Sequence, residues 1–419
     1  MKVETIGKEI IKPSTTTPND LRTLQLSIHD HMISPVYTTA FLFYTKDDLT
    51  SQDHISHKLK TSLSETLTRF HPFAGRINGV TVDCNDEGAV FVEARVDDCT
   101  LSGFIRSPDF ESLKLLLPLD PDATPTWPLL LVKSTYFQCG GMAIAICISH
   151  KLADATSLSI FVRSWTATAR GESDLETIPE FAGAKLYPPA NEAFKIPVDV
   201  QADKGTPVTK RFVFVASKIE ELRVKAASDA VPRPTRVQSV TSLIWRCVAA
   251  SSDTSREKVL VQPANLRPKI PSLSSGNVIG NLFFSTVTFN GKGEVQISET
   301  VKELQERAKE FALLVQGEEG SIGTKLVGQI MGYASKLSSK NQDIHPVTSW
   351  CKLQFYDADF GWGSPVWVAG NVVLSSHNKT VLIDSKDGQG IEAWVTLHQE
   401  AMLLFEQNPD LLAFASPNA

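Results

Sequence analysis

His150 is the side chain best placed for chemistry, because it follows directly on an apolar run. Residues Met142 to Ile148 are all apolar, and Ser149 and His150 come immediately after them. Such a run is typical of a strand buried on both faces, so we expect His150 at the end of a strand. The pKa of an unperturbed histidine lies near neutrality, so an imidazole in a cleft can take a proton from a hydroxyl or an amine. A hydrogen-bonded core histidine is the structural alternative.

Asp154 follows His150 by four positions and begins an amphipathic segment. Apolar residues then recur at helical spacing up to a glycine stop signal, namely at Leu158, Phe161, Val162, Trp165 and Ala169, with Gly171 after them. This pattern predicts a helix with Asp154 as its N-cap. A capping carboxylate accepts amide hydrogen bonds at the helix start, which keeps it ionised and holds it away from the imidazole. We therefore interpret Asp154 as structural.

Other chemistries fit these residues less well. A metal site needs further ligands, and no second His or Cys stands three or four positions after His150. A hydrolase triad would need a GxSxG elbow, which the sequence lacks. Strand alternation also directs Ser149 away from His150. The six cysteines form no CxxC pair, which favours free thiols in a reducing compartment. Cys147, inside the apolar run, fits a small core residue better than a catalytic thiol. We expect no bound metal.

The charge and the apolar pattern limit the partners of the protein. The formal net charge is −6 and no long run of Lys or Arg occurs. Both features argue against nucleic acid or an anionic membrane as the main partner. No apolar stretch approaches the length of a bilayer span, and the opening residues Met1 to Lys12 lack the apolar core of a secretory signal. We expect a soluble, cytoplasmic protein.

The length of 419 residues favours two domains, because one hydrophobic core rarely serves so long a chain. Prolines gather between Ile178 and Pro207, which predicts a linker. We place an N-terminal domain over 1–190, a linker over 191–208 and a C-terminal domain over 209–419. Strands and helices alternate in both parts, which is typical of an α/β fold.

The periodicity gives the expected elements. Strands are expected over 36–44, 129–137, 142–148, 210–216, 259–264, 282–289, 349–356, 366–374, 380–384 and 390–397, with a hairpin of 80–84 and 89–94. Helices are expected over 57–70, 218–227, 235–250, 298–316 and 400–407.

Two motifs make the chain resemble a known family. His150-Lys151-Leu152-Ala153-Asp154 matches HxxxD, and Asp359-Phe360-Gly361-Trp362-Gly363 matches DFGWG. In this order, and in a chain of this length, they resemble the plant BAHD acyl-CoA-dependent acyltransferases. Further family matches lie along the whole chain, at Leu26-Ser27 with Asp30, His71 to Arg76, Asn265 to Arg267, Gly280-Asn281 and Thr348 to Trp350. Matches to the alkaloid-acetylating branch lie at Val82 to Asp86, Trp165 to Thr168 and Lys210 to Phe214.

The resemblance implies a fold, a co-substrate and a set of partners. The fold would be the two-domain chloramphenicol-acetyltransferase-like α/β fold of CoA-dependent acyltransferases, with mixed sheets, helices and a channel between the domains. A segment after DFGWG, about 366–384, would return to the sheet of the N-terminal domain. Acyl-CoA, with acetyl-CoA expected, would be the co-substrate, and a small-molecule alcohol or amine would be the acceptor. The protein would act as a monomer.

The resemblance also implies catalytic and acceptor-side residues. His150 would be the general base that removes the acceptor proton, with no covalent acyl-enzyme. Trp350 would stabilise the oxyanion of the tetrahedral intermediate through its indole N–H, although an aromatic core residue is an equal alternative. Thr348, Tyr37 and Tyr44 would face the acceptor.

Further residues would bind CoA or support the structure. The family implies CoA contacts at Thr235, Ser239 and Asn281, and an ion pair between Asp154 and Arg267, for which a surface arginine is the alternative. The DFGWG residues Asp359, Phe360, Gly361, Trp362 and Gly363 are expected to shape the backbone and to do no chemistry, because two glycines alternating with bulky aromatics predict a tight, packed turn.

Three functions remain open at this point. The leading one is transfer of an acyl group, with acetyl expected, to a hydroxyl of a plant specialised metabolite such as an alkaloid or a terpenoid. The second is acylation of an amine, since the same base serves both nucleophiles. The third is a family member without transfer activity that acts as a binding or regulatory protein.

Overall fold

The computed structural model describes residues 1–45, 51–118, 128–172, 178–191, 206–252, 255–290, 293–337, 341–370 and 378–417. The chain divides into two compact units. Unit 1 contains Met1–Lys195, Ser272–Leu282 and Leu353–Val373, and unit 2 contains Ile196–Pro271, Phe283–Lys352 and Leu374–Ala419. Most of the linker expected over 191–208 lies outside the described residues.

The described part of unit 1 is built around a six-stranded sheet in which only one neighbouring pair is parallel. In spatial order the strands are β1 (Glu4–Ile11), β6 (Ala89–Val96), β7 (Leu130–Phe137), β8 (Met142–Ser149), β3 (Tyr37–Tyr44) and β15 (Trp367–Gly370). Strands β6 and β7 are the parallel pair. Strand β8 is buried at every position and pairs antiparallel with β7 and β3, which confirms the predicted buried strand and its hairpin with β7.

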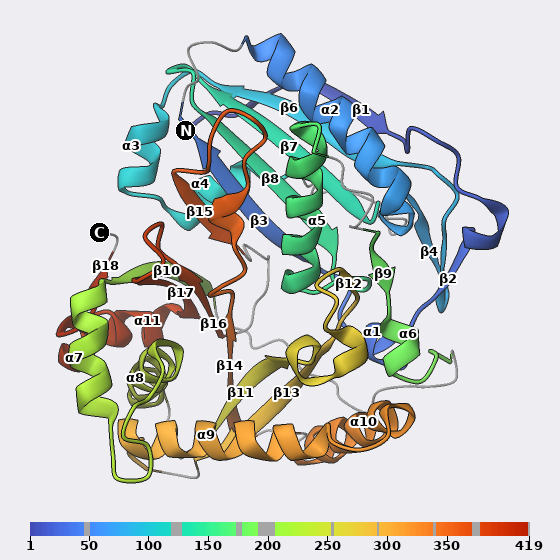
Figure 1. Cartoon of the computed structure of the whole chain (residues 1–419). Coiled ribbons are helices and arrows are strands. Elements are labelled where there is room, and N and C mark those ends of the chain that lie inside the picture. Colours follow the sequence, from blue (N-terminus) through green and yellow to red (C-terminus); the bar gives the residue numbers. More distant parts are fainter. Residues whose placement is uncertain are drawn as a thin grey trace. The chain divides into compact units, whose positions relative to one another are not determined.

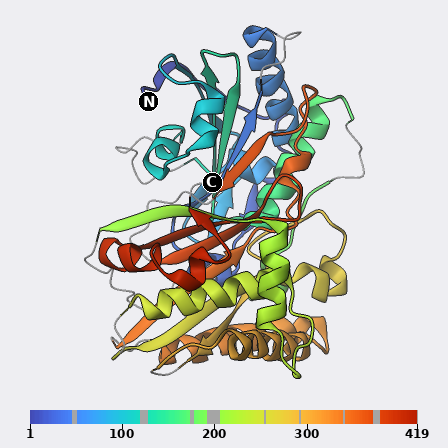
Figure 2. The same ribbon diagram turned by 90° about the vertical axis from the view of Figure 1, so that its left-hand side faces the viewer.

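Helices cover both faces of this sheet. Helices α2 (Gln52–Arg69) and α5 (Ala155–Ala169) lie side by side over one face (Figure 1), where the Trp165 indole donates to Ser62 Oγ at 3.0 Å. Helices α3 (Leu101–Arg106) and α4 (Phe110–Leu115) lie on the other side (Figure 2), where the ring of Phe104 packs 5.7 Å from that of Phe43. The sheet core therefore holds β8 rigidly from both sides.

Smaller elements complete unit 1. They are α1 (Ile28–Met32), α6 (Gly183–Leu186), the paired strands β9 (Glu180–Phe181) and β12 (Val278–Ile279), the three-stranded sheet of β2 (Thr23–Gln25), β5 (Thr81–Asp83) and β4 (Arg76–Asn78), and 3-10 turns at Asn19–Leu21, His71–Ala74 and Phe355–Asp357.

The hairpin predicted over 80–84 and 89–94 is wrong. Strand β5 pairs with β2 and β4, whereas β6 pairs with β1 and β7. The intervening loop is held by other segments: Asp86 accepts hydrogen bonds from the amide and hydroxyl of Thr17, and the Gly88 amide donates to the Ala74 carbonyl. These anchors pull the two strands into different sheets.

The described part of unit 2 contains a seven-stranded mixed sheet. In spatial order the strands are β13 (Phe283–Phe289), β11 (Glu257–Asn265), β14 (Gln342–Ser349), β16 (Lys379–Asp384), β17 (Ile391–His398), β10 (Pro207–Phe214) and β18 (Ser416–Pro417). The helices are α7 (Ala216–Ala226), α8 (Arg236–Ala250), α9 (Ile297–Leu314), α10 (Glu319–Lys336), α11 (Gln399–Phe405) and α12 (Pro409–Leu412). Short elements at Arg267–Lys269 and Pro271–Leu273 are 3-10 turns. The core forms where α7 and α8 cover one face of the sheet, through residues such as Phe212, Leu243 and Leu382.

In unit 2, one helix was not predicted and one expected strand was wrong. Helix α10 escaped prediction because Gly320, Gly323, Gly328 and Gly332 mask its periodicity. The strand expected over 349–356 instead ends at Ser349 as β14. Strand β14 is rich in polar residues, so its sequence did not indicate a strand. One of them, His345, has a partner on a neighbouring strand: its Nε2 lies 2.8 Å from the hydroxyl of Thr380 on β16.

The segment predicted to return to the sheet of unit 1, 366–384, extends too far towards the C-terminus. Strand β15 pairs antiparallel with β3, with Trp367 opposite Phe43. Strand β16 pairs instead with β17 and β14 in unit 2. Residues 371–377, between β15 and β16, lie outside the described residues.

Three further observations concern the described ranges as a whole. None of their helices is both long and apolar enough to cross a membrane. No group of three or more His, Cys, Asp or Glu side chains in these ranges could hold a metal ion. All six cysteines are free thiols, as predicted.

Candidate active site

A tight turn presents His150 at the end of β8. The His150 amide donates to the Val36 carbonyl at 2.8 Å and so extends the pairing with the β3 side by one residue. The amides of Leu152 and Ala153 then both donate to the Ser149 carbonyl, at 3.0 and 3.2 Å. This turn leads directly into α5, so the strand, the histidine and the helix follow one another as predicted.

Asn281 fixes the imidazole of His150. Asn281 Oδ1 lies 3.0 Å from His150 Nδ1. The Asn281 Nδ2 group donates to the His150 carbonyl at 2.7 Å and to Asp30 Oδ1 at 2.8 Å. Because both of these partners are acceptors, they set the orientation of the amide and leave Oδ1 to face the ring. His150 Nδ1 must then carry the hydrogen, which leaves Nε2 unprotonated and able to act as a base.

Asp30 anchors Asn281 from the other side. Its second oxygen, Oδ2, accepts from the Ser27 amide at 2.9 Å and from the Ser27 hydroxyl at 2.7 Å, in a capping box at the start of α1. Burial raises the pKa of Asp30, and the hydrogen bonds from Ser27 and Asn281 oppose that rise. A chain of hydrogen bonds therefore runs from Ser27 through Asp30 and Asn281 to His150.

A second imidazole, His29, contacts the backbone of Asn281. His29 Nδ1 lies 3.0 Å from the Asn281 carbonyl, and the ring packs 4.6 Å from that of Tyr187. The side chain is only 5% exposed. Burial, with a smaller contribution from the nearby His150, lowers the pKa of His29 to about 4, although the hydrogen bond to the Asn281 carbonyl opposes that shift. His29 is therefore neutral at neutral pH and donates through Nδ1.

Asp154 caps α5, which confirms that prediction. Its Oδ1 accepts from the amide and hydroxyl of Ser157, at 2.8 and 2.9 Å, and its Oδ2 accepts from the Leu282 amide at 3.2 Å. The Ser157 hydroxyl in turn lies 3.0 Å from both the amide nitrogen and the carbonyl oxygen of Gly280. The residues on either side of Asn281 are thus tethered to the start of α5.

The protonation of His150 follows from these surroundings. Burial lowers its pKa below the ordinary value, while the negative charge of Asp154 and the hydrogen bond with Asn281 raise it in part. The net effect keeps the imidazole neutral at physiological pH. A neutral ring with a fixed tautomer is the form that a general base requires.

The two tyrosines predicted to face the acceptor lie at opposite ends of β3. Tyr37 pairs with Ser149, beside His150, and its hydroxyl donates to the Pro128 carbonyl at 2.7 Å. Tyr44 pairs with Met142, seven residues further along, which corresponds to about 23 Å in a strand. Its hydroxyl donates to the Ala358 carbonyl at 2.7 Å. Tyr44 is thus buried far from His150, and the prediction that it faces the acceptor is wrong.

The DFGWG residues form a packed turn in unit 1. Asp359 Oδ1 accepts from the amides of Gly361 and Gly363 at 2.6 and 2.9 Å, and both glycines have positive φ, of 105° and 98°. Phe360 is fully buried, 4.8 Å from the ring of Trp165, and Trp362 stacks on Phe360 at 5.4 Å. This is the tight, packed turn that the sequence predicts.

Two of the predicted CoA contacts are wrong. Asn281 belongs to unit 1 and has no exposed surface, and its side-chain groups are used by His150 and Asp30. Ser239 is also fully buried, and its hydroxyl donates to the Thr235 carbonyl at 3.0 Å. Thr235 caps α8 on the surface of unit 2, and its role towards CoA stays a prediction.

The other predicted residues belong to unit 2. Trp350 follows β14, is 3% exposed, and donates through its backbone amide to the Leu382 carbonyl at 2.7 Å. Thr348 lies on β14 opposite Val381. Arg267 begins a 3-10 turn and is buried. Their catalytic, acceptor and ion-pair roles stay predictions.

Asp30, His29 and Ser157 belong to this site without a role predicted from the sequence. The Ser27-x-x-Asp30 spacing is a capping-box signal that indicates a buried carboxylate at a short helix. No local signal joins Asp30 to Asn281, which lies 251 positions away.

The fold and the sequence both match known proteins. The solved structure of vinorine synthase has a TM-score of 0.85 and 31% identity, covering 99% of each chain. The fold is therefore the two-domain chloramphenicol-acetyltransferase-like fold of CoA-dependent acyltransferases. The Transferase family profile matches residues 1–412. BAHD acyltransferase BIA1 of Arabidopsis thaliana is 42% identical, covering 100% of this chain and 98% of the relative, and limonoid 21-O-acetyltransferase of Melia azedarach is 35% identical, covering 100% and 99%. The chain belongs to the Transferase family of plant BAHD acyltransferases and is an acyltransferase.

Proposed function

We propose that the protein transfers an acyl group, with acetyl as the expected group, from acyl-CoA to a hydroxyl of a plant specialised metabolite such as an alkaloid or a terpenoid. The observation that carries the proposal is the fixed tautomer of His150, whose Nδ1 faces Asn281 Oδ1 at 3.0 Å. The name of the limonoid 21-O-acetyltransferase supports acetyl transfer to oxygen in a relative.

In the proposed reaction, His150 Nε2 removes the proton of the acceptor hydroxyl as its oxygen attacks the thioester carbonyl. The new carbon–oxygen bond forms, the carbon–sulfur bond breaks, and the proton passes from Nε2 to the departing thiolate of CoA. General-base assistance of this kind contributes roughly 10²- to 10⁴-fold in rate. Because the lowered pKa keeps His150 unprotonated near neutrality, the base is ready before the acceptor binds.

The oxyanion of the tetrahedral intermediate needs a donor, and we propose the indole N–H of Trp350 for this role. One preorganised donor is worth about 10²- to 10³-fold in kcat. The burial of Trp350, at 3% exposure, supports the proposal because a donor in a water-excluded site interacts more strongly with developing charge.

The test combines the purified protein with acetyl-CoA and a library of alcohols and amines, and it follows release of free thiol. We expect turnover with an alcohol, abolished in His150→Ala and retained in His57→Ala, which replaces an exposed histidine on α2. Turnover with amines alone would support the alternative N-acylation. Absence of both thiol release and CoA binding would refute the enzymatic proposal.

A further inference from the structure

The chain segment that carries Trp350 is held by an unusual backbone arrangement at the end of β14. Strand β14 ends at Ser349, and the Trp350 amide still donates to the Leu382 carbonyl of β16 at 2.7 Å. The chain then turns sharply, and Lys352 adopts a positive φ of 69°. A long side chain rarely adopts this conformation, so surrounding contacts must maintain it.

Asp384, the last residue of β16, supplies that contact. Its Oδ2 accepts from the Lys352 amide at 2.6 Å. The Cys351 amide, one residue earlier, donates to the Ser349 hydroxyl at 3.3 Å. Three successive amides, starting at Trp350, are therefore fixed against the ends of β14 and β16. The Asp384 carboxylate holds the most strained of them.

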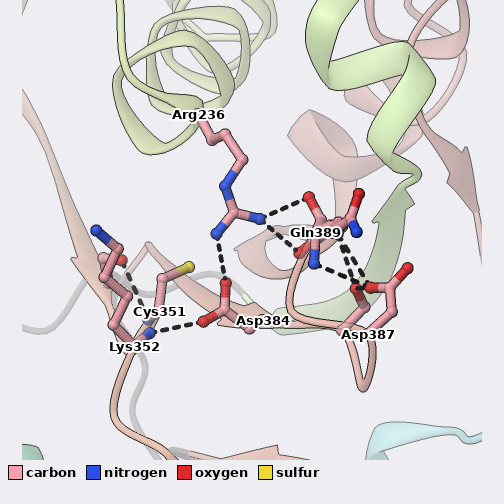
Figure 3. A network of polar contacts seen from close by, with 9 residues as sticks. Arg236, Cys351, Lys352, Asp384, Asp387 and Gln389 are labelled. Atoms are coloured by element: carbon pink, nitrogen blue, oxygen red, sulfur yellow. Dashed lines mark hydrogen bonds and ion pairs between the residues drawn. The ribbon is translucent and has the colours of Figure 1, made fainter.

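Arg236 in turn holds Asp384, as Figure 3 shows. Arg236 Nη2 donates to Asp384 Oδ1 at 3.1 Å, and Nη1 donates to the Gln389 carbonyl at 2.5 Å. Both side chains of the ion pair are mostly buried, at 24% and 18% exposure. The planar guanidinium thus joins the end of β16 to the loop between β16 and β17.

Hydrogen bonds within the loop between β16 and β17 hold the Gln389 carbonyl in place. Asp387 Oδ1 accepts from the Ser385 hydroxyl at 2.5 Å and from the amides of Gln389 and Gly390 at 3.0 and 3.3 Å (Figure 3). These bonds close the loop and keep the Gln389 carbonyl aimed at Arg236. Arg236 consequently finds both of its partners in fixed positions.

Arg236 occupies an unfavourable position in α8. It is the first residue of the helix, directly after the Thr235 cap. A positive charge at a helix N-terminus is unfavourable, because the amide dipoles already place positive charge there. Helix stability therefore gives no reason for an arginine at this position, whereas its bonds to Asp384 and Gln389 do.

We propose that Arg236 and Asp384 form a clamp that positions Trp350 for catalysis. The inference rests on the proposed function, in which Trp350 donates to the oxyanion. The clamp touches neither substrate nor the reacting atoms. It acts through the backbone of residues 350–352: it holds the turn, and the turn fixes the position from which the Trp350 side chain projects.

The test uses the full chain and the alcohol found in the thiol-release screen. We expect Asp384→Ala to lower kcat about 10-fold, with the Kd for CoA changed less than 3-fold. Asp384→Asn keeps an oxygen for the Lys352 amide and should recover at least 3-fold of that loss. The matched control is Asp410→Ala, which removes one ion-pair partner of Arg246, a residue further along α8; this pair is also 3.1 Å apart, and Arg246 is also 24% exposed. The control should retain the wild-type kcat.

A spectroscopic reading isolates the positioning role. In protein labelled with 5-fluorotryptophan, the Trp350 resonance is assigned from its loss in Trp350→Phe. We expect Asp384→Ala to shift or broaden that resonance, and Asp410→Ala to leave it unchanged. We also expect Asp384→Ala to cause no further loss of kcat when added to Trp350→Phe, because its effect passes through the indole.

The outcomes separate this inference from the proposed function. An unchanged Trp350 resonance in Asp384→Ala, a kcat within 3-fold of wild type, additive losses in the double variant, or a weaker Kd for CoA with unchanged kcat would each overturn the clamp. A wild-type kcat in Trp350→Phe would instead overturn the donor role of Trp350, and the fluorine resonance would then decide on the clamp alone.

Discussion

Replacing Asn281 by alanine should disable the base while leaving His150 in place. The substitution removes the hydrogen bonds to His150 Nδ1 and to the His150 carbonyl, and it removes one partner of the buried Asp30. At about 1 kcal/mol net for each of these bonds, the free energy of unfolding should fall by about 3 kcal/mol. Without the Oδ1 acceptor, the ring can rotate and exchange tautomers. We therefore expect kcat to fall on the order of 10²-fold, within the range that a general base contributes.

Asn281→Asp is the matched variant, because it keeps the size and the acceptor but loses the donor. Its carboxylate would lie where the Asn281 amide now approaches Asp30 at 2.8 Å, and a negative charge beside His150 raises the pKa of an imidazole. In the wild type, burial lowers the pKa of His150, so kcat/KM should decline only below pH of about 6.5. In Asn281→Asp the decline should move to higher pH.

The assay measures kcat and kcat/KM between pH 5 and 9, together with urea unfolding of each variant. A kcat for Asn281→Ala within 3-fold of wild type, alongside the expected loss of stability, would show that the network supports folding alone. An unmoved acid decline in Asn281→Asp would refute the electrostatic link between this position and His150.

Three further substitutions test the surrounding structure. Asp154→Ala removes the cap of α5 and the acceptor for the Leu282 amide, so urea unfolding should show a loss of about 2 kcal/mol. A loss below about 0.5 kcal/mol would contradict the structural role of Asp154. His29 has a folded pKa of about 4 against 6.5 unfolded, so its stabilisation is present above pH 6.5 and is lost as pH falls towards 4, amounting to about 2 kcal/mol between pH 7 and 5. His29→Gln should reduce the fall in stability over that range by this amount, and an equal fall in both proteins would refute the assignment. Asp359→Ala frees the amides of two glycines and should cost about 2 kcal/mol by urea unfolding, with an unchanged pH profile of kcat/KM; a shifted profile would show that the turn reaches the base.

Local patterns predicted the backbone that presents His150. The apolar run indicates β8 because seven consecutive apolar residues between glycines and polar residues are typical of a strand buried on both faces, and Asp154 marks the start of α5 because a carboxylate there satisfies free helix amides. Both inferences depend on neighbours in the sequence, which is why their bounds agree with the structure to within a residue or two.

Local sequence patterns could not predict the polar network around His150. Asn281 meets His150 from 131 positions away and Asp30 from 251 positions away. The resemblance marked Gly280-Asn281 but led to a CoA contact, because a motif match carries no information about burial. Strand β14 failed for a related reason: its buried His345 has a partner on the neighbouring strand β16, and no single-strand pattern reveals such a partner.

The two ends of HxxxD have different roles: His150 is the proposed base, and Asp154 supports the segment that fixes it. His150 is fixed by Asn281, and Asn281 is fixed by its own neighbours, since Asp154 holds the Leu282 amide and Ser157 holds Gly280. The aspartate thus supports the histidine through a segment more than a hundred residues further along the chain. Spacing of four residues is needed because it places one residue in the turn and the other at the helix cap, where its carboxylate can reach that segment. The motif is then a structural junction as well as the carrier of the proposed base.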